Sequence, residues 1–174
     1  DKKEFKVSGI EVDSDLVEKC LERNLNVSSK NLNELPNENY NLITLFDVLE
    51  HLDKPIEYFK ALRKKIKNSG YIVMYTPYIN SIAFELMESK QNLLAPFQHL
   101  CFFNEESIDY LAKITGLKIY SIEHYGLDMM DYLLMKEYED KFPYTEKLKD
   151  MMNLVQSCLD FMGVSNHMRI TLTK

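Results

Sequence analysis

Glycine is scarce in this 174-residue sequence, and its distribution excludes one common type of cofactor site. The five glycines are never closer than ten residues apart; they are Gly9, Gly70, Gly116, Gly126 and Gly163. A loop that binds phosphate or a nucleotide through its backbone amides needs glycines only a few residues apart. A nicotinamide-dependent oxidoreductase requires such a G-x-G-x-x-G loop, so its absence weighs against that class.

Cysteines and long apolar runs are also few. Cys20, Cys101 and Cys158 are odd in number and far apart, which fits neither a disulfide framework nor a paired-cysteine metal site. No apolar run approaches the roughly 18 residues that span a bilayer, and residues 1–4 do not resemble a signal peptide. We therefore expect a reduced, cytoplasmic protein with no metal ion and no membrane association.

Basic residues are in deficit: 21 Lys and Arg stand against 27 Asp and Glu, for a net charge of -6. Nucleic-acid binding usually needs a basic face, so we expect no nucleic-acid partner. One basic cluster does occur, made of Lys60, Arg63, Lys64, Lys65 and Lys67. We interpret it as the solvated end of a helix, where cations complement the helix dipole, with an anionic-partner site as the alternative.

What the sequence does contain is an alternation of β-like and helical segments, typical of a single α/β domain with a mostly parallel sheet. The expected strands are 6–12, 26–28, 40–46, 71–76, 117–123 and 167–173. The expected helices are 13–24, 55–70, 104–116, 127–138 and 144–162, with Gly70, Gly116 and Gly163 at helix ends. No repeat or low-complexity segment interrupts the pattern.

Residues 47–55, Asp-Val-Leu-Glu-His-Leu-Asp-Lys-Pro, resemble the DVLEH-x-x-x-P segment of class I S-adenosylmethionine-dependent methyltransferases. The resemblance is to the small-molecule group of the methyltransferase type 11, 12 and 23 kind, which acts on quinone precursors and sugars. Four further segments follow the order of that family; they are 9–13, 31–36, 69–77 and 98–116. Five weak matches in the right order make coincidence improbable.

The resemblance implies a Rossmann-like methyltransferase sheet, mostly parallel, with an antiparallel last strand. It also implies a helical insertion at 126–163 before that strand. The family opens with a strand, a GxGxG loop and a helix, and this chain lacks all three. We therefore expect 1–174 to be one N-terminally truncated methyltransferase domain. Its unpaired strand edges should either re-pair, joining strand 6–12 to strand 40–46, or lead to self-association.

The cofactor implied by the resemblance is S-adenosylmethionine, and five residues match the positions that bind it. Glu11 would accept hydrogen bonds from the ribose hydroxyls, Asn31 would accept one from the adenine amino group, and the Leu32 backbone N–H would face the ring. Phe46 and Asp47 would lie at the methionine part. The alternatives are a solvated carboxylate for Glu11, a core position for Leu32 and a capping role for Asp47.

Two histidines are the candidate catalytic residues, because imidazole can take a proton from an acceptor near neutral pH. His51 lies in the DVLEH segment and His99 in the 98–103 segment. Either ring could instead only brace a loop through its nitrogens. His124 and His167 lie in expected strands without a motif, so we interpret both as structural.

The function that follows is methyl transfer from S-adenosylmethionine to a small-molecule acceptor, which the protein positions and desolvates. We expect the acceptor and a lid at 78–103 and 127–162. The alternative is a non-catalytic fragment or interaction module with a methyltransferase fold.

Overall fold

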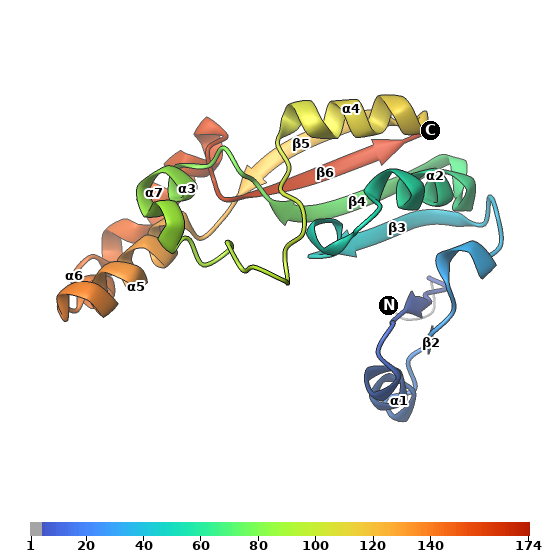
Figure 1. The fold of residues 1–174 in the computed structure, drawn as a ribbon, viewed down its shortest axis with the longest axis horizontal. Helices are drawn as coiled ribbons and strands as arrows, with labels where there is room; N and C mark the ends of the chain where they lie inside the picture. Colours follow the sequence, from blue (N-terminus) through green and yellow to red (C-terminus); the bar gives the residue numbers. More distant parts are fainter. Residues whose placement is uncertain (1–4) are drawn as a thin grey trace.

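A four-stranded sheet forms the centre of the computed structural model, which describes residues 5–174 (Figure 1). Its strands are β3 (Tyr40–Phe46), β4 (Ile66–Pro77), β5 (Lys118–Tyr125) and β6 (His167–Thr173), in the order β3-β4-β6-β5. β3 and β4 are parallel, and β6 is antiparallel to both β4 and β5. The expected mostly parallel sheet with an antiparallel last strand is confirmed. Residues 1–4, which we expect not to belong to a signal peptide, lie outside the described residues.

The last strand of the chain is not at the edge of the sheet, since β6 lies between β4 and β5. Its burial explains this position. Met168, Ile170 and Leu172 alternate along β6 and are completely buried. An outer strand would leave such side chains partly exposed to water, whereas a central strand packs them beneath helices on one face of the sheet.

The first strands form a separate unit. β1 (Gly9–Ile10) and β2 (Val27–Ser28) pair in parallel around helix α1 (Ser14–Glu22), and Figure 1 shows this unit standing away from the large sheet. The expectation of a 6–12 strand that joins strand 40–46 is therefore wrong. Among residues 5–174, no second layer covers this segment, and Val12 is 91% exposed, so β1 is limited to the two residues that pair with β2.

Two helices cover one face of the large sheet. α2 (Pro55–Lys65) begins with proline at its first turn, where a missing N–H is harmless. α4 (Glu105–Thr115) begins at the Asn104–Ser107 capping box and ends at Gly116, whose φ is +73°. Between these helices and the strands lies the core, which includes the fully buried Phe59, Ile66, Ile72, Met74 and Ile108.

Gly70 does not end a helix as expected. α2 ends at Lys65, and Gly70 lies inside β4 with no positive φ. A Cβ at Gly70 would approach the Ile66 side chain to 2.7 Å and the Tyr40 carbonyl oxygen to 2.9 Å. Close packing of the chain, rather than a left-handed turn, therefore calls for glycine here.

Lys65 also departs from the expected solvated basic cluster, because it is only 4% exposed. Its Nζ donates to the carbonyl oxygens of Asn33 and Leu35 and to Oδ1 of Asn37. These bonds fasten the loop before β3 and its 3₁₀ turn η1 (Leu32–Glu34) to the end of α2. Lys65 is therefore a buried residue that links α2 to the 33–37 loop by hydrogen bonds, and it is not a solvated surface charge.

The remaining helices gather at one end of the sheet (Figure 1). They are α3 (Ile82–Met87), α5 (Asp128–Asp140), α6 (Tyr144–Lys147) and α7 (Lys149–Met162), with a 3₁₀ turn η3 (Glu88–Lys90) after α3. Three of them occupy the stretch before β6 where an insertion was expected. Within residues 5–174, no helix is long and apolar enough to cross a membrane.

Candidate functional site

The candidate site lies at the edge of the large sheet where β3, β4 and β5 end, which we call the carboxyl edge. β6 runs the other way, so its first residue belongs to this edge too: His167 pairs with Pro77 of β4 and Tyr125 of β5. Ligands of open α/β sheets bind in the crevice outside the carboxyl ends of the strands. Residues at this edge are therefore the first candidates for cofactor and substrate contacts.

Asp47 turns the chain away from the end of β3. Its φ is +52°, a left-handed conformation that is uncommon for a residue with a side chain, and its N–H donates to the Tyr75 carbonyl oxygen at 3.0 Å. Its carboxylate makes no hydrogen bond with residues 5–174, so the capping alternative is not observed. Beside it the Phe46 ring is 57% exposed. Both residues are thus open toward the space beyond the strand.

Glu50 holds the turn that follows, a role that its sequence pattern did not predict. It is 1% exposed, and its Oε2 accepts a 2.9 Å hydrogen bond from Oγ1 of Thr76 at the end of β4. Its carbonyl oxygen accepts from the backbone N–H groups of Leu100 and Cys101 at 2.8 and 3.1 Å. Glu50 therefore connects η2 (Leu49–His51), β4 and the 98–103 segment in this structure.

His51 and His99 are brought together at this edge, with ring centroids 4.9 Å apart. Nδ1 of His51 lies 2.6 Å from the Gln98 carbonyl oxygen, and Nδ1 of His99 lies 2.7 Å from that of Leu93. A carbonyl oxygen only accepts hydrogen bonds, so each Nδ1 carries the proton and each Nε2 is left available. Bracing of the loop is thus observed for both histidines. Their catalytic role stays a prediction.

The same histidines form a group with Glu50 that sequence reasoning missed. One donor atom of each residue lies within 4.8 Å of the others, a spacing that a metal ion can bridge. The Glu50 carboxylate already accepts from Thr76, which leaves Oε1 as its free donor, 3.9 Å from Nε2 of His51. The expectation that the protein holds no metal ion stays a prediction, which metal analysis of the purified protein can test.

Tyr75 and His167 stack at the centre of the carboxyl edge, with ring centroids 4.7 Å apart and planes inclined by only 3°. Burial raises the pKa of Tyr75 to about 12, and the charges of Asp47, Asp160 and Asp128 add to this. Burial lowers the pKa of His167, while Asp47 and Asp128 oppose the shift. Both rings are thus neutral near pH 7. His167 lies outside the family-like segments, and no local pattern indicates that the first residue of an antiparallel strand reaches this edge.

The other predicted cofactor residues lie elsewhere. Glu11 follows β1, where its Oε1 accepts from the Asp13 N–H at 3.0 Å. Asn31 begins η1, and its Oδ1 accepts from the Asn33 N–H at 3.0 Å. Leu32 is buried in the core, and its N–H has no hydrogen-bond partner among residues 5–174. Two of these three residues therefore already use part of their hydrogen-bonding capacity locally.

The structure thus divides the five predicted cofactor residues into separate groups. Phe46 and Asp47 stand at the carboxyl edge, whereas Glu11 belongs to the β1–α1–β2 unit, which Figure 1 shows at the opposite end of β3. η1 precedes β3 and contacts the last residue of α2, so it lies near the start of β3. A seven-residue strand spans about 23 Å. The residues predicted for ribose and adenine are consequently not adjacent to those predicted for the methionine part.

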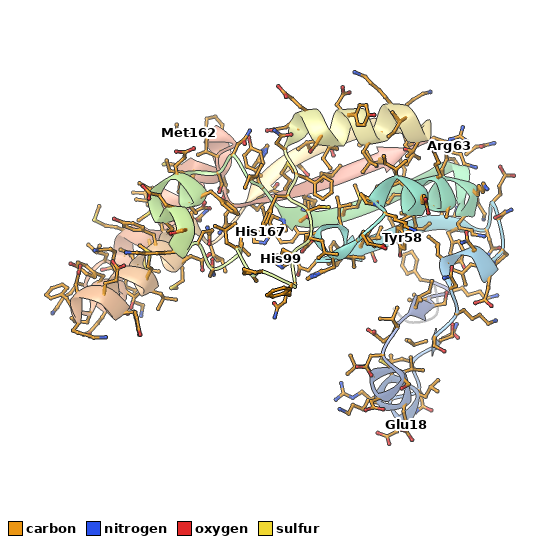
Figure 2. The ribbon with its side chains drawn as sticks, viewed as in Figure 1. Glu18, Tyr58, Arg63, His99, Met162 and His167 are labelled. Atoms are coloured by element: carbon orange, nitrogen blue, oxygen red, sulfur yellow. The ribbon has the colours of Figure 1, made fainter. Side chains whose placement is uncertain are left out.

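The two hollows found on the surface do not contain the candidate residues of the carboxyl edge. One hollow of about 280 Å³ lies between α3 and α5, and another of about 340 Å³ lies between β5 and α7. The second hollow borders the carboxyl edge through Tyr125 and Asp160, but neither hollow is lined by Phe46, Asp47, His51, His99 or His167. The gathering of ionisable side chains identifies the carboxyl edge instead (Figure 2 labels His99 and His167 there).

Comparisons with known proteins agree with this architecture. The model of a family described as a methyltransferase domain matches residues 2–122. A S-adenosylmethionine-dependent methyltransferase structure from Archaeoglobus fulgidus is similar with a TM-score of 0.66 and 17% identity, covering 99% of this chain and 78% of that chain. A second, from Mesorhizobium loti, has a TM-score of 0.63 and 11% identity, covering 97% and 80%.

A third structure is the Haemonchus contortus phosphoethanolamine N-methyltransferase 2 in complex with S-adenosyl-L-methionine, with a TM-score of 0.58 and 18% identity. The match covers 97% of this chain and 43% of that one. No curated protein matches the chain significantly. The structural likenesses establish the fold, and the family match covers well over half of the chain. This protein therefore belongs to the methyltransferase domain family of class I enzymes, whose methyl donor is S-adenosylmethionine.

Proposed function

We propose that the protein methylates a small-molecule acceptor that binds at the carboxyl edge, between the ends of β3 and β4 and the helices α3, α5 and α7. The observation that carries the proposal is a group of ionisable side chains at this edge, some of whose hydrogen-bonding atoms have no hydrogen-bond partner among residues 5–174. Among the described residues, the Asp47 carboxylate makes no hydrogen bond, and the rings of His51, His99 and His167 are hydrogen-bonded through Nδ1 and not through Nε2. Such groups are typical of a ligand site.

The candidate cofactor residues are of chemical types that can bind S-adenosylmethionine. When bound, this cofactor supplies a methyl group already activated on a sulfonium, so the protein mainly holds and orients the reactants. We propose that Asp47 faces the cofactor's ammonium group beside Phe46, that Oε2 of Glu11 faces the ribose, and that Asn31 and the Leu32 N–H face the adenine. Glu11, Asn31 and Leu32 lie apart from the carboxyl edge, so residues 5–174 do not form a closed cofactor pocket in this structure.

The negative charges at the carboxyl edge favour an acceptor that carries no negative charge of its own. Asp47, Asp128 and Asp160 act together on Tyr75 at this edge, so an anionic acceptor would be repelled. An amine or a neutral hydroxyl compound suits this environment. The Haemonchus contortus neighbour is named for phosphoethanolamine, an amine that also carries an anionic phosphate. Because of the carboxylates at this edge, we propose instead an amine or hydroxyl acceptor without an anionic group for this protein.

The test is release of S-adenosylhomocysteine from S-adenosylmethionine with probe acceptors. Ethanolamine, tyramine and catechol represent amines and hydroxyls, while phosphoethanolamine and 4-hydroxybenzoate carry an anionic group. We expect turnover with the first set and less with the second. Asp47→Asn should reduce turnover, whereas Lys118→Gln, at the far end of β5, should not. The absence of turnover with every probe, at S-adenosylmethionine concentrations that calorimetry shows to saturate the chain, would refute the proposal.

The second candidate, a non-catalytic module with this fold, is favoured by one observation: the predicted ribose and adenine residues do not converge with the carboxyl edge. The two candidates differ in cofactor binding, which calorimetry measures directly. A folded chain that binds neither S-adenosylmethionine nor S-adenosylhomocysteine would support the module.

A further inference from the structure

We propose that His167 is the general base that takes the proton from the methyl acceptor, an inference that rests on the proposed methyl-transfer function. Three features of the structure carry it: the tautomer that the surroundings of His167 impose, the open position of its second ring nitrogen, and its place at the carboxyl edge.

Hydrogen bonding fixes the tautomer. The side-chain amide of Asn166 donates through Nδ2 to Oδ2 of Asp131 at 2.9 Å, and its Oδ1 accepts from the Leu127 N–H at 3.2 Å. Oδ1 is therefore a carbonyl oxygen, and it lies 2.9 Å from Nδ1 of His167. A carbonyl oxygen cannot donate, so Nδ1 must carry the proton. In the neutral ring, Nε2 then holds a lone pair.

That lone pair is accessible. Nε2 of His167 has no hydrogen-bond partner among residues 5–174, and it is not one of the buried side-chain atoms that lack a partner. It is therefore at least partly accessible to solvent. The ring itself is half-buried against Tyr75, which holds its plane. An immobilised imidazole with an open, unprotonated nitrogen has the form that a general base requires.

The position of His167 places this nitrogen at the proposed acceptor site. Its strand partners Pro77 and Tyr125 both lie at the carboxyl edge. The titratable groups that face the ring are Asp47 after β3, Tyr75 on β4, His99 from the 98–103 segment, and Asp128 at the start of α5. Figure 2 labels His99 and His167 at this same end of the sheet.

Two differences favour His167 over His51 and His99 as the base. Nε2 of His51 lies 3.9 Å from Oε1 of Glu50, so a protein carboxylate already faces it. His51 also ends the short 3₁₀ turn η2 and His99 lies on a loop, whereas His167 is the first residue of a central strand, where side chains are positioned more rigidly. We therefore assign proton transfer to His167 and loop bracing to the other two.

The proton transfer needs no reactant besides the acceptor, S-adenosylmethionine and water. The O–H or N–H bond of the acceptor breaks, and its proton goes to Nε2 of His167, which becomes an imidazolium. The acceptor atom uses its freed electron pair to bond the methyl carbon, and the electron pair of the broken carbon–sulfur bond stays on sulfur. The imidazolium then loses its proton to water through the open Nε2. Asp47 and Asp128 stabilise the transient positive charge of the ring.

Two measurements on the intact chain test the state of the ring without any turnover. Nitrogen-15 NMR of labelled histidine should show Nδ1 protonated and Nε2 unprotonated, with a titration midpoint below that of an ordinary histidine. Diethyl pyrocarbonate reacts with unprotonated imidazole nitrogens, and peptide mass spectrometry should show His167 modified about tenfold faster than His124, whose Nε2 is buried 3.1 Å from Glu105. A lone pair on Nδ1 of His167, or equal reactivity, would overturn the proposal.

Turnover tests the role. His167→Asn should lower the rate of S-adenosylhomocysteine release with ethanolamine, tyramine or catechol by roughly 10²- to 10⁴-fold and remove the fall in rate at acidic pH. Calorimetric binding of S-adenosylhomocysteine should be unchanged. The control is His124→Asn, a histidine on the neighbouring strand that contacts α4 instead. Equal rates for His167→Asn and the wild type refute the base alone, whereas no turnover by the wild type refutes the proposed function and the base with it.

Discussion

At the scale of single residues, the buried pair of Glu50 and Thr76 explains why the turn after β3 has a defined shape. A carboxylate that is nearly inaccessible to water needs hydrogen bonds to compensate for its lost solvation. Thr76 supplies the 2.9 Å bond from the end of β4, so the pair connects two strand ends at the carboxyl edge. The candidate histidine His51 follows Glu50 directly and depends on this support.

Thr76→Val should therefore destabilise the protein by about 2 kcal/mol, because it removes the only side-chain donor to Oε2 of Glu50 among residues 5–174 while keeping nearly the same volume. The measurement is urea unfolding at pH 7. Thr44→Val, an exposed position on β3, is the matched control and should change stability by less than about 0.5 kcal/mol. Equal effects of the two variants would show that the bond contributes nothing.

The lowered pKa of His167 predicts a pH dependence of stability. The unfolded chain protonates this histidine near its ordinary pKa, whereas the folded chain resists protonation to a lower pH. The stabilisation is thus fully present above the ordinary pKa and is lost as the pH falls through the lowered value. His167→Asn should flatten the fall in stability between about pH 7 and pH 5. Parallel pH profiles for variant and wild type would contradict this.

At the scale of elements, the helical stretch before β6 is attached to the sheet by a buried polar group. Oδ2 of Asp128, at the start of α5, accepts from the Asn166 N–H and from Nε2 of Gln156, both at 3.0 Å. Gln156 lies on α7, and Asn166 immediately precedes β6. One carboxylate therefore joins two helices to the strand that carries His167. Gly126 fits here because a Cβ would lie 2.2 Å from Oδ1 of Asn166.

Asp128→Ala should destabilise this attachment by about 3 kcal/mol, because two hydrogen bonds to a buried carboxylate are lost and the Asn166 N–H is left unpaired. Hydrogen exchange should accelerate in α5 and α7 more than in β4. Asp150→Ala, exposed in the first turn of α7, should have an effect below about 0.5 kcal/mol. Unchanged exchange in α5 would mean that the helices are held by apolar contacts alone.

At the scale of the whole molecule, the separation of the β1–α1–β2 unit from the carboxyl edge predicts weak cofactor binding by this 174-residue chain. If two or three hydrogen bonds of roughly 1–2 kcal/mol each are not made, affinity falls by about 10²- to 10⁴-fold. Isothermal titration with S-adenosylmethionine should therefore give weak binding. A micromolar dissociation constant would show that the unit closes onto the carboxyl edge or that other residues hold the cofactor.

The open edge of β3 predicts self-association. Among the described residues, β3 pairs only with β4, and Leu42 on β3 is 55% exposed. Unpaired strand edges with apolar side chains favour pairing with a second copy. Sedimentation should show a concentration-dependent dimer, and Leu42→Lys should shift it toward monomer. A wild-type chain that stays monomeric at every concentration would contradict the prediction.

The sequence by itself determined the elements whose cause is local. The apolar runs of β3 and β4, the Asn104 cap and the Gly116 end of α4 depend on neighbours within a few residues, so pattern and capping chemistry predicted them. The order of the motif segments also predicted the family. His51 and His99 were singled out for the same reason, because both stand within those segments.

Tertiary structure decided whatever depends on distant neighbours. Gly70 and Lys65 were misinterpreted because their packing partners lie in other elements: Tyr40 for Gly70 and the 33–37 loop for Lys65. The expected strand 6–12 is reduced to the two residues of β1 because no second layer within the described residues 5–174 covers it. His167 joined the candidate site only because β6 runs antiparallel between β4 and β5, which brings its first residue to the carboxyl edge. Strand direction and neighbour order arise from packing across the whole chain, and a local pattern does not specify them.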